Sequence, residues 1–529
     1  MTTEHLEIER KLEADDSYAA PDLTGVDGVD AVGEPEEQAL EATYFDTADL
    51  RLLRNKVTLR RRTGGSDAGW HVKLPAAAGA RRELHQPVGR ASRTVPKAVL
   101  APVLGVLGTA VPEPVATLRT RRVVRRLLGE GGAVLAEVAD DTVHGTALGA
   151  NPGEPATVTT WRELEVELVD GDEALLDAVT ERLVAAGARL SDSPSKVGRV
   201  LAGRLGQPGG APAGGPGDEG DATGSRRKKG KKEKARQPTA GDVVLAALAA
   251  QVAALRAADL AIRTEQPEGV HDLRVACRRL RSITAAFRTV LPRKATDPLR
   301  AELRWVGGQL SAARDGEVAL AHLRELVAAQ PPELVLGPVA ARFQQTEISG
   351  RVDDARRVIR TLTDRRYLLL LDALAALLAD PPLTEFAGGP ARAVMADAVR
   401  RNGKRLRRAV TAAREAQGEE RHTALHAVRK AGKRVRYTAE VAADVLGGPA
   451  TALVDCLKEA QETLGSAQDT VVTREYAVRL GRAAFAAGEN AWTYGRLHGL
   501  EEARAARAED AFWELEPRVR TAVRAAAKS

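Results

Sequence analysis

A duplicated basic motif constrains the fold of the C-terminal half of this sequence more than any other feature. The segment 271–282 reads HDLRVACRRLRS, and the segment 426–437, 155 residues further along, reads HAVRKAGKRVRY. A second pair of motifs, LSAARD at 310–315 and LGSAQD at 464–469, repeats at an offset of 154 residues. Two independent motifs with nearly the same offset indicate an internal duplication. The surrounding apolar residues recur with helical spacing, which predicts a duplicated helical unit.

Each copy of the basic motif places one histidine and three cations on a single helix face, at positions i, i+3, i+7 and i+10. These residues are His271, Arg274, Arg278 and Arg281 in the first copy, and His426, Arg429, Lys433 and Arg436 in the second. Like charges along one helix face repel each other unless anions meet them. The anions are either carboxylates of a neighbouring helix or a bound polyanion, and recurrence in both copies favours the polyanion.

The N-terminal region has the alternation of β-strands. Residues 5–12 predict a strand with Glu7, Glu9 and Lys11 on one face and apolar residues on the other. Further short alternating segments are expected at 43–47, 57–62, 69–74, 83–88, 117–128, 133–143 and 159–169, with helices at 96–107 and 172–186. Most of these strands follow each other through short connections, which favours an antiparallel sheet or barrel.

Charged residues at strand spacing separate by sign in this region. The cations are Arg60, Arg62, His71, Lys73, Arg119 and Arg121, and the carboxylates are Glu137, Asp141, Glu163, Glu165 and Glu167. Asp140 is an alternative to Asp141, which shares the strand face of Glu137. One charged face is compatible with an ordinary solvated surface, but in a closed barrel it lines a lumen. Such a lumen suits a compact polyphosphate with its divalent metal.

Composition divides the chain into three parts: a strand-rich domain at 1–203, a linker at 204–240 and a helical domain at 241–529. The helical domain contains repeats at about 241–390 and 391–529. The linker is rich in Gly and Pro and carries the block RRKKGKKEKAR at 226–236, which is either a spacer or a polyanion-binding tail. The net charge of +6 fits an anionic partner.

The two cysteines, Cys277 and Cys456, are far apart, which excludes a disulfide scaffold and a cysteine-based zinc site. No apolar run is expected to span a membrane, because Asp372 interrupts the candidate at 367–378. A cytoplasmic location is therefore expected, with association with polyphosphate granules as a further expectation.

The first domain resembles the CYTH family of triphosphate tunnel metalloenzymes. The resemblance is carried by ExExK at 7–11, YFDT at 44–47, LRRR at 59–62, WHVKLP at 70–75 and the charged positions downstream as far as Lys196. It implies an eight-stranded antiparallel β tunnel and a hydrolase of triphosphates that depends on Mg²⁺ or Mn²⁺.

The resemblance also implies roles for individual residues. The residues expected to bind the substrate phosphates are Lys11, Arg60, Arg62, Lys73, Arg119, Arg121 and Lys196. The residues expected to bind the metal are Glu7, Glu9, Glu137, Asp141, Glu163, Glu165 and Glu167. The expected catalytic residues are Lys11 and Glu165. Thiamine triphosphatase and adenylate cyclase are enzymatic alternatives, and a non-catalytic polyphosphate-binding scaffold is a third.

The helical domain resembles the CHAD domain, a conserved-histidine module that binds inorganic polyphosphate. The resemblance implies an all-α domain of two duplicated, pseudo-symmetric helical bundles, in which the eight motif residues given above would bind polyphosphate. Nucleic acid is a weaker alternative partner, because its grooves usually offer aromatic rings for base stacking. The motif helices have only Phe287 and Tyr437 near their ends. The chain as a whole is thus expected to be an α+β two-domain protein that couples triphosphate hydrolysis to polyphosphate binding.

Overall fold

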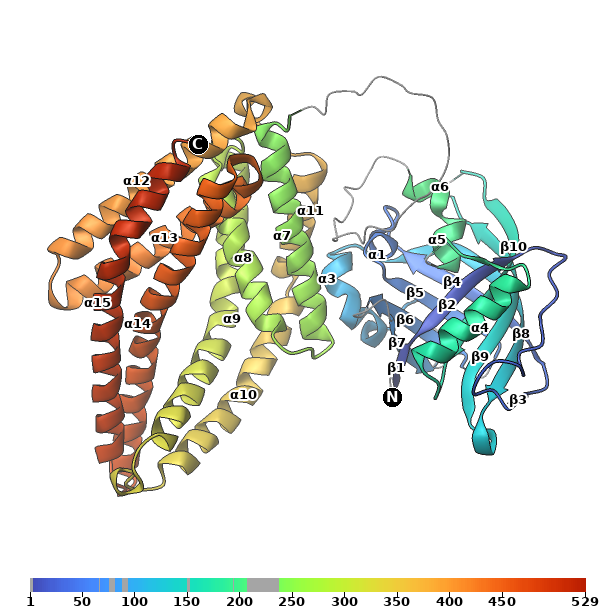
Figure 1. The fold of residues 1–529 in the computed structure, drawn as a ribbon, viewed down its shortest axis with the longest axis horizontal. Coiled ribbons are helices and arrows are strands. Elements are labelled where there is room, and N and C mark those ends of the chain that lie inside the picture. Colours follow the sequence, from blue (N-terminus) through green and yellow to red (C-terminus); the bar gives the residue numbers. More distant parts are fainter. Residues whose placement is uncertain are drawn as a thin grey trace. The chain divides into compact units, whose positions relative to one another are not determined.

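The protein is described from a computed structural model that covers residues 3–65, 67–75, 81–87, 94–149, 153–193, 195–206 and 237–529. It divides into two compact units, Met1–Ala213 and Gly214–Ser529 (Figure 1). The described strands all belong to the first unit, and the second unit is helical. Most of the predicted linker, including its basic block, lies outside the described residues.

The first unit is built on one antiparallel sheet. Its strands are β1 (Thr3–Glu7), β2 (Glu9–Ala14), β3 (Ala31–Val32), β4 (Glu36–Asp46), β5 (Thr58–Thr63), β6 (Gly69–Pro75), β7 (Arg81–Pro87), β8 (Glu113–Leu128), β9 (Val134–Ala147), β10 (Thr157–Leu168) and β11 (Arg189–Leu190). Their order is β1-β7-β6-β5-β4-β8-β9-β10-β2-β11, with β3 beside β8. The predicted strands and the antiparallel arrangement are confirmed.

The first strand of the chain closes this sheet on itself. β1 pairs with β7 near one end of the strand order, and β2 pairs with β10 near the other. Only Ile8 separates β1 from β2, so a single bent strand joins the two ends. If β1 and β2 are counted as one strand and the two-residue strands β3 and β11 are left out, the described part of the chain contains the predicted eight strands. Closure gives the sheet an inner face and an outer face.

Short helices cover parts of the outer face of the sheet and its ends. They are α1 (Arg51–Arg54), α2 (Lys97–Leu100), α3 (Leu104–Leu107), α4 (Glu173–Ala185), α5 (Lys196–Val200) and α6 (Ala202–Leu205). Helix α4 begins at the N-cap Asp172, whose side chain accepts a hydrogen bond from the Leu175 backbone N–H at 2.9 Å. Its buried Leu176 and Val179 belong to the same apolar cluster as Leu164 on β10. Apolar residues therefore face outward onto α4, which leaves the alternate positions of the strand for the interior.

The second unit consists of long helices. They are α7 (Ala240–Arg263), α8 (Gly269–Ala286), α9 (Arg293–Ala328), α10 (Val339–Thr363), α11 (Arg365–Ala379), α12 (Ala391–Glu415), α13 (Gly418–Leu446), α14 (Gly448–Ala486) and α15 (Trp492–Ala526). Helices α9 and α14 begin 155 residues apart, the same offset as that between the two basic motifs. One apolar core runs through both repeats and includes the equivalent motif residues Leu273 and Val428. Helix α8 packs on α13, so the two motif helices are neighbours.

Helix α7 corrects one expectation from the sequence. Among the described residues it is long and apolar enough, with a mean hydropathy of 1.7, to meet the length and composition criteria for a membrane span. Its residues Val244, Leu248 and Leu255 are fully buried in the helical core. This buried face belongs to the helical core, and 33% of the apolar window is buried in it.

The helical core makes a stability prediction. Leu273 is fully buried on α8, so Leu273→Ala should lower the free energy of unfolding by about 2–5 kcal/mol, through lost burial and the cavity left behind. Urea denaturation followed by circular dichroism at 222 nm measures this change. Leu369→Ala is the control, because Leu369 is 49% exposed on α11 and should cost far less. Equal losses in the two variants would contradict the assignment of α8 to the core.

Candidate functional site

The closed sheet encloses a polar cavity of about 400 Å³. Inward-facing side chains of β1, β2, β4 to β10 and the start of α5 line it. The lining residues include eight arginines and lysines and seven carboxylates, so fixed charges of both signs nearly balance inside the sheet. A cavity of this kind can surround an anion and a metal cation at the same time.

One wall of the cavity is acidic because neighbouring strands bring their inward residues into register. Glu167 on β10 lies opposite Glu9 on β2 and opposite Glu137 on β9. Two residues further along, Glu165 lies opposite Lys11. These rows follow directly from antiparallel pairing, in which residues opposite each other point to the same face.

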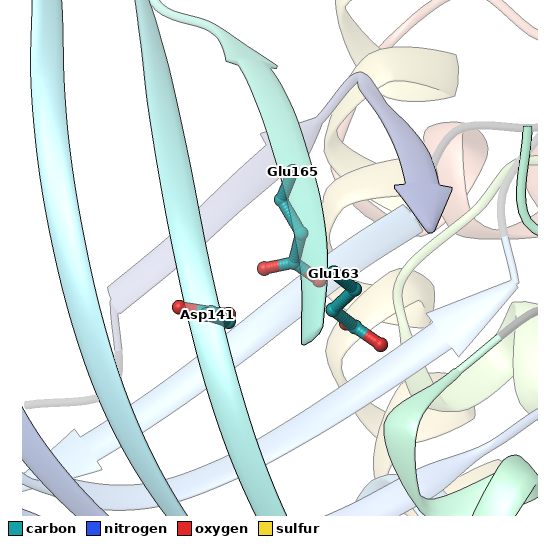
Figure 2. A group of neighbouring side chains, drawn as sticks. All are labelled: Asp141, Glu163 and Glu165. Carbon is teal, nitrogen blue, oxygen red and sulfur yellow. The ribbon is translucent and has the colours of Figure 1, made fainter. Parts of the chain in front are cut away.

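Three buried carboxylates gather in the acidic wall, Asp141 on β9 with Glu163 and Glu165 on β10 (Figure 2). One oxygen from each lies within 4.8 Å of the others. Lys196 Nζ lies 3.0 Å from Asp141, 2.6 Å from Glu163 and 2.7 Å from Glu165. Ser195 caps helix α5 by accepting a hydrogen bond from the Gly198 backbone N–H at 3.1 Å, and this fixes the turn that carries Lys196.

Arg122 on β8 completes this group of charges. Its guanidinium donates two hydrogen bonds to Asp141, at 2.8 and 2.7 Å, and one to Glu165 at 2.6 Å. Glu165 also pairs with Lys11. Burial alone would raise the pKa of Glu165, but Lys11, Lys196 and Arg122 outweigh it and hold that pKa well below its usual range. Glu165 therefore remains ionised at neutral pH.

The opposite wall is formed by β5, β6 and β7 with the end of β1. Lys73 Nζ lies 2.6 Å from Glu7 and 3.4 Å from Glu83. Arg60 lies 3.5 Å from the same Glu83, and His71 Nδ1 lies 2.5 Å from it. Burial and the nearby Glu83 raise the pKa of Glu7 to about 8 although Lys73 is close. Glu7 consequently exchanges a proton near physiological pH.

The predicted site residues of the first domain mostly meet in this cavity. Those among its described lining are Glu7, Glu9, Lys11, Arg60, Arg62, Lys73, Glu137, Glu165, Glu167 and Lys196. Asp141 and Glu163 lie behind them in the carboxylate group. Glu137 sits at the margin, paired with the half-exposed Arg126 at 2.9 Å. Asp140 points away and pairs with Arg162, so the structure favours Asp141 over Asp140.

Two predicted phosphate-binding residues are not in the cavity. The side chains of Arg119 and Arg121 are 79% and 68% exposed and pair with Glu41 and Glu37 on the outer face of the sheet. The inward residues of β8 are the even-numbered ones, and Arg122 is among them. Arg122 was not predicted from the sequence, because β8 carries arginines at both odd-numbered and even-numbered positions and therefore on both of its faces. Glu83 was also missed, and its position opposite Lys73 was the signal that could have revealed it.

The donor set of the acidic wall suits a hard divalent cation. Asp141, Glu163 and Glu165 offer only carboxylate oxygens, the ligands that Mg²⁺ and Mn²⁺ prefer. Lys196 and Arg122 neutralise this group in the absence of a metal. These three carboxylates would therefore hold the ion, with Glu9 and Glu167 as neighbouring oxygen donors.

In the helical unit, cations of the two motif helices meet between α8 and α13. Arg278 Nε donates a hydrogen bond to the Tyr437 hydroxyl at 3.0 Å. Lys433 forms no ion pair with another described residue. Burial, together with Arg429, Arg278 and Arg436, lowers its pKa to about 7. This junction therefore holds more positive charge than its own carboxylates neutralise.

The other motif residues divide between different surroundings. Arg436 pairs with Glu440 at 3.4 Å. Arg281 faces a separate cluster with Arg300 and Arg304, where burial and those two cations lower its pKa. His271 is exposed, and His426 and Arg274 are partly buried. The structure thus brings Arg278, Arg429, Lys433 and Arg436 together and places Arg281 elsewhere. The side chain of Asp315, in the second predicted motif, lies outside the described residues.

Comparisons with known proteins find a matching domain in each of the two units. The CYTH domain model matches residues 5–200, and the CHAD domain model matches residues 246–478. Two uncharacterized proteins of Mycobacterium tuberculosis, from strains CDC 1551 and H37Rv, are each 36% identical over 508 residues, which are 94% of this chain and 93% of each relative. The chain belongs to the CYTH–CHAD family. The predicted family and the order of its two domains are confirmed.

Solved structures are similar to one domain or the other. PptA from Streptomyces chartreusis is 21% identical, covers 53% of this chain and 99% of its own, and has a TM-score of 0.44. The CHAD domain from Ricinus communis is 24% identical, covers 54% of this chain and 92% of its own, and has a TM-score of 0.42. A Hippeastrum protein, described as an adenylyl cyclase with a dominant triphosphatase activity, is 18% identical, covers 37% of this chain and 96% of its own, and has a TM-score of 0.24.

The inner position of Arg122 can be tested in the CYTH domain. Arg122→Gln should weaken binding of inorganic tripolyphosphate at least about tenfold, because charged hydrogen bonds contribute about 1.5–3 kcal/mol. Isothermal titration calorimetry measures this affinity. Arg121→Gln, one residue away on the outer face, is the matched control and should bind as the unchanged protein does. The reverse ranking of the two variants would show that the outer face of β8 binds the anion.

Proposed function

We propose that the CYTH domain hydrolyses inorganic triphosphate or short polyphosphate with the help of Mg²⁺ or Mn²⁺. The observation that supports this most strongly is the lining of the 400 Å³ cavity, in which lysines and arginines face carboxylates across a closed sheet. Among the described lining residues Tyr44 is the one aromatic ring besides the imidazoles of His71 and His85. Tyr44 is held beside Arg60, 3.4 Å away, so the cavity offers little to stack on an organic group.

The cations of the cavity suit the phosphate oxygens. Lys11, Arg60, Arg62, Lys73, Arg122 and Lys196 are fixed by their neighbours and need no large rearrangement to meet an anion. Phosphoryl transfer depends mainly on such positioning and on electrostatic stabilisation of the transferred group. A bound divalent ion would supply Lewis-acid polarisation of the phosphate and of the attacking water. Ionised Glu165, next to Lys11, is in place to orient that water.

The internal ion pairs require substrate and metal to enter together. Each lysine that turns to a phosphate leaves its carboxylate partner buried and uncompensated, which costs several kcal/mol. The metal cation compensates those carboxylates when the anion takes the lysines. The nearly balanced charges of the cavity therefore favour binding of a metal–triphosphate complex over either component alone.

Two alternatives use the same cavity differently. An organic triphosphate, as in a thiamine triphosphatase or adenylate cyclase, would place its phosphates as above and its organic group outside the described lining. A non-catalytic scaffold would bind polyphosphate without turnover. Phosphate release from tripolyphosphate, long polyphosphate, ATP and thiamine triphosphate, with Mg²⁺ and with Mn²⁺, separates the three proposals.

The carboxylates of the cavity give a direct test of the hydrolase proposal. Glu9→Gln should lower kcat for tripolyphosphate by orders of magnitude, because it removes a charged oxygen donor next to Glu165 and Glu167. Phosphate release measured against metal concentration reports the loss. Glu41→Gln serves as the control, since Glu41 is exposed on the outer face and pairs with Arg119. Normal turnover by the Glu9 variant would exclude Glu9 from metal binding.

We further propose that the CHAD domain binds long-chain polyphosphate where α8 and α13 meet. A group of cations with few carboxylate partners lies at this junction: Arg278 on α8, and Arg429, Lys433 and Arg436 on α13. A linear polyanion crossing both helices contacts both repeats, and the second contact is then intramolecular. The test is the affinity of the protein for long-chain polyphosphate and for duplex DNA of equal charge, each measured at two salt concentrations. Tighter binding of polyphosphate supports the proposal. Equal affinities for the two polymers would identify a general basic surface instead.

The depressed pKa of Lys433 predicts how pH changes polyphosphate affinity. Lys433 is largely neutral above its pKa of about 7, and it gains its charge as the pH falls through that value. Lowering the pH from 8 to 6.5 should therefore strengthen binding, by roughly two- to fivefold, as one added charge contact would. The charged groups facing Lys433 are Arg429 and Arg436 on α13, Arg278 on α8 and Asp469 on α14.

Titration at the two pH values with Lys433→Arg isolates this effect, because arginine stays charged throughout. The variant should bind with nearly the same affinity at pH 8 and pH 6.5. His426 contributes little to the change in affinity between these two pH values, because burial and Lys430 lower its pKa and keep the imidazole neutral over most of this range. An identical pH response in the variant would exclude Lys433 as its source.

A further inference from the structure

An apolar pocket of about 150 Å³ opens in the second repeat of the CHAD domain, and of the four cations at the α8–α13 junction its described lining includes Arg429 alone. It lies between α12 and α15, over α13 and α14, and its apolar lining includes Leu406, Val410, Leu457, Leu464 and Phe512. Figure 1 shows these four helices packed as one bundle. A cavity of this size takes one benzene-sized ring.

The second repeat has a glycine at this pocket where the first repeat has a larger side chain. Gly432 lines the pocket, and the repeated motif aligns it with Cys277, which is buried in the core of the first repeat. A Cβ atom at Gly432 would meet nothing closer than Gln461 and Leu457, each at 3.9 Å. The space at this position is therefore open.

The wall of the pocket contains two hydrogen-bond donors without partners. Gln461 is 8% exposed, and its amide nitrogen is buried and forms no hydrogen bond with a described residue. The Nε atom of Arg429 is likewise buried and forms no hydrogen bond with a described residue. A buried donor that remains unpaired costs about 1–3 kcal/mol. An alkyl chain in the pocket would leave both donors unpaired, whereas a heteroaromatic ring offers acceptors to them.

The rim of the pocket is strongly basic. Arg400, Lys404 and Arg407 on α12 and Arg520 and Arg524 on α15 line it, and all five are exposed. Arg400 pairs with Asp397 at 3.2 Å, and the other four form no ion pair with a described residue. These cations lie where the polar part of a ligand would leave the apolar interior.

We propose that this pocket binds a purine nucleoside polyphosphate. The six-membered ring of the base fills the apolar space beside Phe512, and its ring nitrogens accept hydrogen bonds from Gln461 and Arg429. The five-membered ring, which carries the sugar, lies toward the basic rim. The phosphates lie on the cations of α12 and α15. The occupant differs from the polyphosphate proposed for the α8–α13 junction, because a bare polyphosphate has nothing to place in an apolar pocket.

Photolabelling of the full chain tests this proposal at a defined site. 8-Azidoadenosine triphosphate, with EDTA present, should label peptides from α14 and α15, as mapped by mass spectrometry. ATP should protect those peptides, and tripolyphosphate at the same concentration should not. Peptide mapping separates this site from the CYTH cavity, which both anions would occupy.

Two variants should weaken the labelling without disturbing polyphosphate binding. Gly432→Leu fills the open space and should reduce labelling of these peptides at least about tenfold, since a filled pocket excludes the ring. Gln461→Leu removes the amide donor at nearly unchanged volume and should weaken labelling as well. Gly499→Leu is the control, because Gly499 is exposed on α15 outside the pocket lining and a Cβ there meets nothing within 4 Å.

Three results would overturn the proposal: no label in the α14 and α15 peptides, protection by tripolyphosphate equal to that by ATP, or full labelling of the Gly432→Leu protein. Polyphosphate affinity is measured on the same proteins. It should be unchanged in Gly432→Leu, so a failure of the polyphosphate proposal is visible separately from a failure of this one.

Discussion

The requirement that every charge inside the closed sheet has a neighbour of opposite sign shapes the whole first domain. Removing an ion from water costs several kcal/mol unless it is paired and hydrogen-bonded. Arg122 and Lys196 meet this requirement for Asp141, and Lys11 meets it for Glu165. Alternation along the strands supplies the charges, and register across them brings opposite signs together. The fold is therefore stable with charges that a ligand can later take over.

Duplication gave the helical domain two similar backbones with different surroundings. Arg279 and Arg434 occupy equivalent positions in the two motifs. Arg279 lies 3.6 Å from Glu440, whereas Arg434 lies among Arg405, Arg300, Arg288 and Arg281, which together with burial lower its pKa to about 10. A duplicated series of helices thus carries an asymmetric distribution of charge. The two repeats share one apolar core and differ in the charges around their motif helices.

Much of this architecture could be predicted from sequence patterns, because its determinants are local. Glu7, Glu9 and Lys11 share a strand face by alternation, and the structure places all three in one cavity. The segment TLRTRRVVRRLL at 117–128 contains arginines on both faces, so alternation could not decide between Arg121 and Arg122. Glu83 depends on the pairing of β6 with β7, and the pocket at Gly432 depends on the packing of four helices. Such features arise from contacts between distant segments, which periodicity does not encode.

The closure of the sheet by its first strand has a consequence for the order of folding. Residues 9–14 are synthesised early, but they pair with residues 162–167 of β10, about 150 positions later. Pairing over such a separation carries a high loop-closure entropy and slows folding. On the ribosome, the inward-facing Glu9 and Lys11 therefore remain without these partners until β10 has emerged. The first strand to be made is among the last to be completed, so early termination of synthesis leaves an open sheet with an exposed edge rather than a smaller tunnel.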